Sequence, residues 1–131
     1  MSPVSDAERK RINDLADRIV GCAYTVANTL GSGFLEKVYE NALAHELRKA
    51  KLAVEQQHPV KVHYDGVIVG DYAADLLVER TILVELKAAQ GIDDVHKAQC
   101  MNYLKAGDLK MCILINFGRP RMEFLRIVMD F

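Results

Sequence analysis

Three charged residues with the chemistry of a hydrolytic or metal site lie close together in the middle of the chain: Asp75, Glu85 and Lys87. The segment 81–89, TILVELKAA, is apolar enough to predict a strand buried on both faces. Glu85 and Lys87 are two residues apart, so they share one face of that strand, with Cα atoms about 6.5 Å apart. A lone charge in an apolar interior costs several kcal/mol. The two residues therefore form either a mutual ion pair or part of a site.

Asp75 lies on the strand that precedes this segment, and the length of the connecting turn decides where its side chain points. A three-residue turn at 79–81 would place Asp75 directly opposite Glu85 and on the same side of the sheet. A two-residue turn at 79–80 would place it opposite Val84 and turn it to the other side. We predict the three-residue turn. Because two opposed acids repel, this arrangement requires a cation between them, and Mg²⁺ prefers one or two carboxylates plus waters.

Two predicted helices contribute further polar side chains. Gly33, Glu36 and Tyr39 follow at three-residue steps along one helix face, and Gln99 and Tyr103 stand four residues apart on another. Each has a structural alternative. With Gly33 as N-cap, Glu36 would accept hydrogen bonds from first-turn amides. Tyr39 would be a core aromatic residue, and Gln99 with Tyr103 a polar pair on the helix surface.

The apolar periodicity predicts a single domain, residues 1–131, with a mixed sheet flanked by helices, an α/β or α+β architecture. Apolar residues recur at three- and four-residue steps in the helices and alternate in the strands. Asp65-Gly66 is typical of a tight hairpin turn. The predicted order is α-α-β-β-β-α-β-β, with helices at 5–30, 34–50 and 92–106 and strand segments at 60–64, 67–69, 72–78, 82–87, 111–117 and 122–128.

The composition limits the functional classes. Half of the 131 residues are apolar, and the formal net charge of −1 offers no overall basic field for nucleic acid. The three cysteines are widely spaced, without a CxxC pair, and predict reduced thiols in a cytoplasmic protein. The N-terminal segment is polar, so we expect no signal peptide. The apolar runs are all too short for a membrane span. The four histidines lack metal-site spacing.

Taken together, the site residues resemble the PD-(D/E)XK nuclease superfamily, in particular its RecB-like branch, and the Gly33-x-x-Glu36-x-x-Tyr39 string resembles the GxxExxY proteins assigned to that superfamily. The match covers roughly residues 10–128, although Ala74 stands where the proline of the motif would be. The matching elements follow in order along the chain: helical Glu36, Asp75, Glu85-x-Lys87 and the helical pair Gln99-x-x-x-Tyr103.

The resemblance implies a restriction-endonuclease-like core and metal-dependent phosphodiester hydrolysis. Asp75, Glu85 and the Leu86 backbone carbonyl would hold Mg²⁺ or Mn²⁺, with Glu36 completing the acidic cluster. Lys87 would orient the attacking water or stabilise charge on the phosphate. Gln99 and Tyr103 would touch the substrate backbone or brace the metal shell, and Tyr39 would also bind substrate.

The partner implied by the resemblance is nucleic acid, DNA in preference to RNA. Two other functional classes stay open. One is a catalytically inactive binding or assembly module on the same fold, acting as a homo-oligomer or with a partner protein. The other is a small-molecule or nucleotide-binding α/β protein, which the lack of a complete glycine-rich phosphate loop disfavours.

Overall fold

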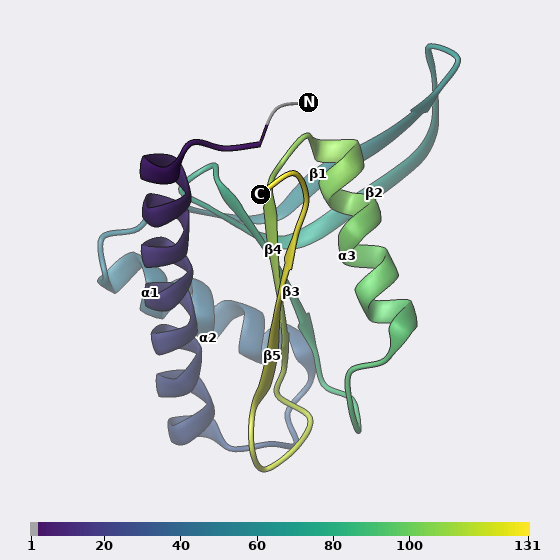
Figure 1. Cartoon of the computed structure of the whole chain (residues 1–131). Coiled ribbons are helices and arrows are strands. Elements are labelled where there is room, and N and C mark those ends of the chain that lie inside the picture. Colours follow the sequence, from purple (N-terminus) through teal and green to yellow (C-terminus); the bar gives the residue numbers. More distant parts are fainter. Residues whose placement is uncertain (1–2) are drawn as a thin grey trace.

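The computed structural model describes residues 3–131 as one mixed five-stranded sheet with helices on both faces (Figure 1). The strands lie in sequence order across the sheet, and only β3 and β4 run parallel. The element order matches the predicted order. The elements are α1 (Asp6–Leu30), α2 (Glu36–Lys49), β1 (Val54–Tyr64), β2 (Val67–Val78), β3 (Ile82–Lys87), α3 (Asp94–Gly107), β4 (Met111–Asn116) and β5 (Glu123–Val128).

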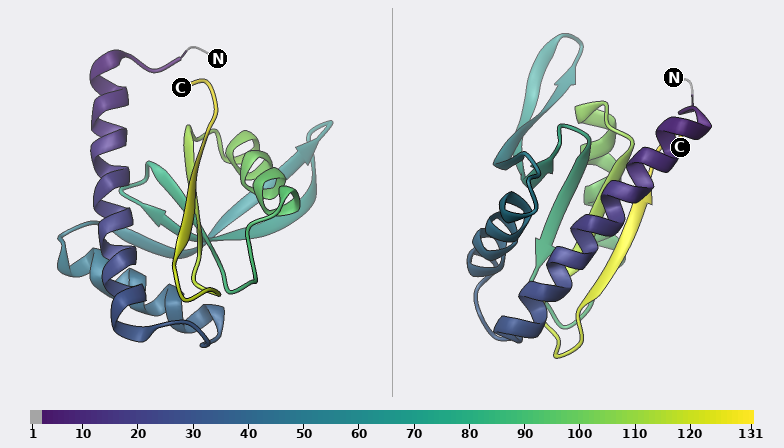
Figure 2. Two further views of the ribbon diagram at one scale, coloured as in Figure 1. Left: turned by 60° about the horizontal axis from the view of Figure 1, so that its bottom comes forward. Right: turned by 90° about the vertical axis from the view of Figure 1, so that its left-hand side faces the viewer.

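The two central strands explain the apolar runs in the sequence. Both faces of β3 and β4 are covered, one by α1 and α2 and the other by α3 (Figure 2). Ile82, Val84 and Leu86 pack in the core beneath α1 and α2, whereas Leu83 packs in the core beneath α3. Because side chains alternate, Glu85 and Lys87 follow Leu83 onto the α3 side of the sheet.

The β2–β3 connection is the three-residue turn that the sequence predicted. Val78 pairs with Ile82, and both Glu79 and Arg80 adopt positive φ angles, 52° and 54°. The N–H of Thr81 closes the turn on the Val78 carbonyl at 3.0 Å. Beyond the turn, the antiparallel register pairs Leu77 with Leu83 and Leu76 with Val84.

The start of α1 agrees with the predicted helix over 5–30, whereas α2 begins later than the predicted residue 34. α1 begins after Ser5, whose hydroxyl accepts from the Glu8 N–H at 3.2 Å. α2 begins at Glu36 with Leu35 as its N-cap, so the expected capping role of Gly33 was wrong. Gly33 instead takes a φ of 112°, which extends the connection between the helices.

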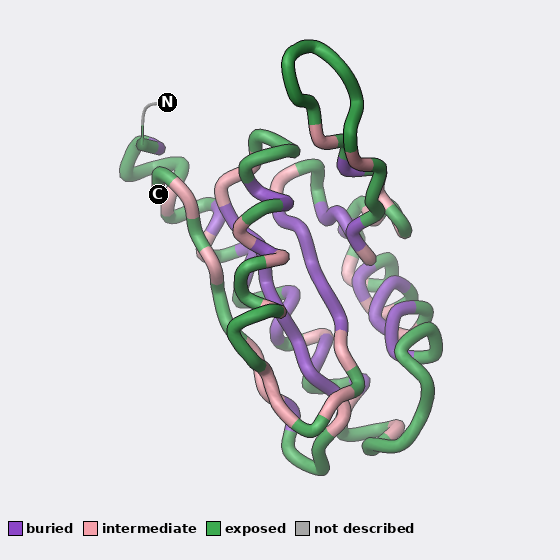
Figure 3. Tube along the Cα trace, turned by 90° about the vertical axis from the view of Figure 1, so that its right-hand side faces the viewer, coloured by how far each residue is buried: buried purple, intermediate pink, exposed green. Residues whose placement is uncertain are grey.

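The β1–β2 hairpin is longer than predicted. β2 runs without interruption through the two expected segments, and β1 begins six residues earlier than expected, at Val54. The hairpin turns at Asp65-Gly66, with φ angles of 53° and 77°. Its distal half extends past the body of the protein, and its exposed tip lies beyond the end of α3 (Figures 1 and 3).

Candidate active site

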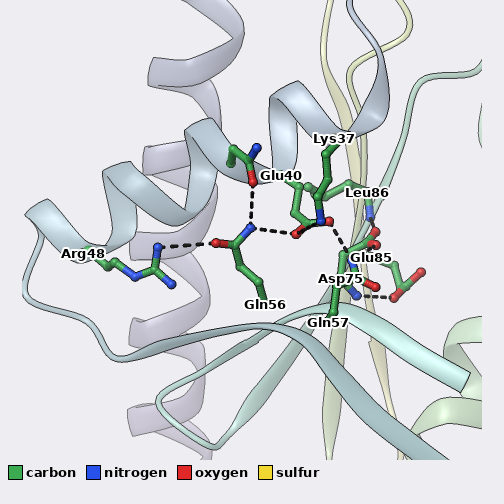
Figure 4. A network of polar contacts seen from close by, with 9 residues as sticks. Lys37, Glu40, Arg48, Gln56, Gln57, Asp75, Glu85 and Leu86 are labelled. Atoms are coloured by element: carbon green, nitrogen blue, oxygen red, sulfur yellow. Dashed lines mark hydrogen bonds and ion pairs between the residues drawn. The ribbon is translucent and has the colours of Figure 1, made fainter.

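Asp75 and Glu85 meet through reciprocal hydrogen bonds between β2 and β3. The Asp75 N–H donates to Glu85 Oε1 at 2.9 Å, and the Leu86 N–H donates to Asp75 Oδ2 at 2.7 Å (Figure 4). Each carboxylate thus accepts a hydrogen bond from a backbone N–H of the strand that carries the other acid. The predicted juxtaposition of the two acids is confirmed, and it follows directly from the three-residue turn.

Burial makes this pair of acids electrostatically unfavourable. Glu85 is only 4% exposed, and burial followed by the charge of Asp75 raises its pKa to about 8. The positive charge of Lys87 lowers the pKa of Glu85, but by less than burial or Asp75 raises it. Burial also raises the pKa of Asp75, against the hydrogen bonds that lower it. Without a cation, the folded protein therefore favours a proton on Glu85 at neutral pH.

Lys87 is tied to the polar pair on α3. Its Nζ donates to Gln99 Oε1 at 3.2 Å, and Gln99 Nε2 donates to the Tyr103 hydroxyl at 3.0 Å. Burial and then the negative charge of Glu85 raise the pKa of Tyr103. The structure thus brings Lys87, Gln99 and Tyr103 together beside Glu85, as the order of the elements in the sequence had suggested.

Glu36 approaches this group from the first turn of α2. Its Oε2 accepts from the Ala88 N–H at 3.4 Å, just past the end of β3. Its charge contributes to the raised pKa values of both Asp75 and Glu85, which places it near the pair. The Ala88 contact joins the start of α2 to the end of the strand that carries Glu85.

Tyr39, expected at the substrate, is fully buried. Its hydroxyl donates to the Gly31 carbonyl at 2.6 Å and accepts from the Phe34 N–H at 3.2 Å. Its ring stacks on Phe117 with centroids 4.6 Å apart. These contacts match the structural alternative: Tyr39 holds the connection between α1 and α2, and substrate cannot reach its side chain in this conformation.

A second polar network, which the sequence did not reveal, adjoins Asp75. Glu40 on α2 is 3% exposed and accepts from Lys37 Nζ, Gln56 Nε2 and Gln57 Nε2 at 3.0, 2.7 and 2.7 Å (Figure 4). The same Gln57 amide donates to Asp75 Oδ1 at 3.3 Å. Gln57 therefore links a fully buried carboxylate to one of the two central acids.

The backbone of Gln57 indicates that this link is imposed by its surroundings. Gln57 has a φ of 55°, which is uncommon for a residue with a side chain and rarer still within a strand. The available sequence signal was the four-residue step from Glu36 to Glu40, which places both acids on one face of α2. It could not show that Glu40 would be buried against β1.

The donor set at the centre suits a hard divalent cation. Asp75 and Glu85 supply carboxylate oxygens, and Mg²⁺ or Mn²⁺ uses one or two carboxylates with water completing the shell. Within residues 3–131, no group of three or more His, Cys, Asp or Glu side chains is arranged to hold a metal ion. The raised pKa of Glu85 fits this donor set, because a divalent ion beside the carboxylate would stabilise its charged form.

The comparisons with known proteins agree with this fold. The family model of the PD-(D/E)XK nuclease superfamily matches residues 13–127, and the chain belongs to that superfamily. The crystal structure of SSO0001 is similar at 18% identity with a TM-score of 0.52; the alignment covers 92% of this chain and 62% of that one. At that identity the likeness shows a shared fold alone. A search of curated proteins finds no match.

The sequence predicted no membrane-spanning segment. Over residues 3–131, none of the helices combines the length and apolar character that crossing a bilayer requires.

Proposed function

We propose that this protein is a metal-dependent nuclease that hydrolyses phosphodiester bonds in nucleic acid. The observation that carries the proposal is the convergence of Asp75, Glu85 and Lys87 on one side of the sheet, two acids joined by backbone hydrogen bonds and a lysine beside them. Membership of the nuclease superfamily supports it. The finer expectations belong to the same proposal: the GxxExxY group and RecB-like branch, a preference for DNA, a cytoplasmic location, and an oligomeric or partner-bound form.

Asp75 and Glu85 are the residues that would hold Mg²⁺ or Mn²⁺, with the Leu86 carbonyl and Glu36 as further ligands. The ion, when bound, supplies Lewis-acid polarisation of the phosphate and lowers the pKa of water. The backbone N–H groups of Asp75 and Leu86 each donate to the other strand's acid, which fixes both carboxylates before any ligand arrives.

Lys87 supplies the positive charge that phosphoryl transfer requires. Gln99 Oε1 accepts from Lys87 Nζ and so holds the amine on the α3 side of the sheet, next to Glu85. From this position the amine stabilises charge that develops on the phosphate oxygens or orients the attacking water. Gln99, braced by Tyr103, positions Lys87, and both side chains would contact the substrate backbone.

Cleavage assays test the proposal. Single- and double-stranded DNA and RNA are incubated with the protein and Mn²⁺ or Mg²⁺, and cleavage must disappear in EDTA. Lys87→Met should lower the rate roughly 100-fold or more, whereas Lys49→Met, at the exposed end of α2 where Lys49 pairs with Glu46, should not change it. Cleavage by Lys87→Met at the parental rate would refute the role of the amine.

A catalytically inactive module on the same fold is the second candidate. It is favoured by the hydrogen bonds that both Asp75 oxygens already accept, one from Leu86 and one from Gln57, which satisfy this acid without a metal. Metal titration separates the two. An unchanged melting temperature in millimolar Mn²⁺ would favour the inactive module, since a ligand that binds the folded state must stabilise it.

A further inference from the structure

A cleft of about 790 Å³ lies between the β1–β2 hairpin and α3, beside the candidate active site. Its volume lies within the roughly 300–1,000 Å³ range of pockets that hold small ligands. Gln99 and Tyr103 line it, and the hydrogen-bonded chain through these two side chains leads to Lys87. Two side chains that line the cleft therefore belong to the polar group next to Glu85.

An aromatic ring is held in place on one wall of the cleft. Tyr72 is 53% exposed, and its ring packs at a 43° tilt on Tyr103 with centroids 6.0 Å apart. Gly70 makes room for the ring, since a Cβ at Gly70 would lie 2.9 Å from Tyr72 Cε2. Support from Tyr103 and Gly70 orders the ring, and its exposure leaves surface on which another flat group can stack.

Two lysines and a histidine line the cleft. Lys61 and His63 come from β1 and Lys105 from α3, and the described lining includes no Asp or Glu. Asp71 pairs with Lys61 in the hairpin register, so the two side chains leave the strands on the same side, although Asp71 does not line the cleft. The chain as a whole carries a net charge of −1, so this local excess of positive charge is a property of the cleft.

We propose that the cleft binds single-stranded nucleic acid, with a base stacked on Tyr72 and backbone phosphates beside Lys61 and Lys105, and leads the strand toward Lys87; this assignment rests on the proposed nuclease function. Bases in a duplex are stacked on one another and cannot offer a face to a tyrosine ring, whereas an unpaired base can. The combination of an ordered aromatic ring and cationic walls is the arrangement by which proteins hold single strands.

Binding is measured separately from cleavage, by fluorescence anisotropy in EDTA with labelled oligothymidylate, oligouridylate and a DNA duplex of equal length. A single strand should bind more tightly than the duplex. Tyr72→Ala should weaken single-strand binding roughly tenfold, and Tyr72→Phe should retain it. Tyr64→Ala is the matched control, because Tyr64 is an exposed hairpin tyrosine (74%) outside the cleft lining.

The salt dependence of binding tests the basic wall. Replacing both Lys61 and Lys105 with Gln should reduce the slope of log K against log salt by about 1.4, at about 0.7 per phosphate contact on a single strand. Lys10→Gln, on α1 and paired with Asp14, should leave the slope unchanged. An equal loss of slope in both variants would show diffuse attraction and overturn the assignment.

The outcomes separate this inference from the nuclease proposal. Tighter binding of the duplex than of both single strands, or parental affinity in Tyr72→Ala, overturns the cleft assignment even when the protein cuts nucleic acid. Ring-dependent binding without cleavage in Mn²⁺ upholds the cleft and overturns the nuclease. Thermal melting of each variant in EDTA confirms that it is folded at the assay temperature, and Tyr72→Phe keeps the test informative should Tyr72→Ala unfold.

Discussion

Replacing Glu85 with Gln should stabilise the metal-free protein at neutral pH. Glu85 is 4% exposed, and burial and the neighbouring charge of Asp75 raise its pKa from the usual 4.5 to about 8. Glutamine keeps the side-chain oxygen that accepts from the Asp75 N–H at 2.9 Å, but it carries no charge. The substitution therefore removes the cost of protonating Glu85 on folding at neutral pH, while leaving the hydrogen bond in place.

The sign and the size follow from proton linkage. An acid whose pKa is higher in the folded state binds more protons there, so the stability of the parent falls as the pH rises above 4.5 and levels off above about 8. At about 1.4 kcal/mol per pH unit, the gain from Glu85→Gln has an upper limit of about 3 kcal/mol at pH 7. Near pH 4, where Glu85 is protonated in both states, the variant and the parent should be equally stable.

Urea denaturation in EDTA at pH 4, 5.5 and 7 measures this difference. The gap between variant and parent should widen with pH. Mn²⁺ at 1,000 times its Kd should reverse the order, because the parent gains about 4.1 kcal/mol and the variant loses a ligand. A variant that is less stable than the parent at pH 7 in EDTA, or a gap that does not depend on pH, would refute the reasoning.

Three further predictions test the groups around the centre. Gln57→Gly, which relieves the positive φ of 55° but removes the link to Asp75, should weaken Mn²⁺ binding roughly tenfold in a thermal-shift titration; unchanged affinity would deny that the amide positions this acid. Tyr39→Phe should destabilise the fold by about 1–3 kcal/mol, and cleavage below the melting transition should persist. Loss of cleavage in the folded variant would instead indicate that Tyr39 contacts the substrate. Asp93→Ala removes the capping box of α3 and should cost about 1 kcal/mol in thermal or urea unfolding, an effect that is absent if solvent caps the helix equally well.

The parts of the site that were predictable from sequence depend on local geometry. The three-residue turn fixes the register of β2 against β3, and the alternation of side chains then fixes which acids face each other. The four-residue step from Gln99 to Tyr103 likewise places both side chains on one face of α3, where their hydrogen bond forms. These relationships involve neighbours in the chain or across one short turn, so the sequence contains them.

The network around Glu40 could not be predicted because it depends on tertiary packing of α2 against β1. The first half of β1, VEQQHP, is polar and contains Pro59, so it lacks the apolar alternation of a typical strand. It is a strand because β1 lies at the sheet edge, where proline and exposed polar residues are tolerated. The positive φ of Gln57 likewise has no sequence signature, since that conformation is most common in Gly, Asn and Asp.

The start of α2 shows a smaller failure of the same kind. Glycine before a helix suggested a cap at Gly33, but buried Tyr39 binds both the Gly31 carbonyl and the Phe34 N–H. These two bonds hold the connection extended until Leu35. Contacts from a buried side chain in the first turn of the helix thus override the preference for a glycine cap.

Anomalous diffraction from crystals soaked in Mn²⁺ tests the central claim most directly. One strong anomalous peak is expected within coordination distance of carboxylate oxygens of both Asp75 and Glu85, and it should disappear in Asp75→Asn. A map without a peak at this pair at millimolar Mn²⁺, or a peak that persists there in Asp75→Asn, would contradict the claim that the two acids form a cation site.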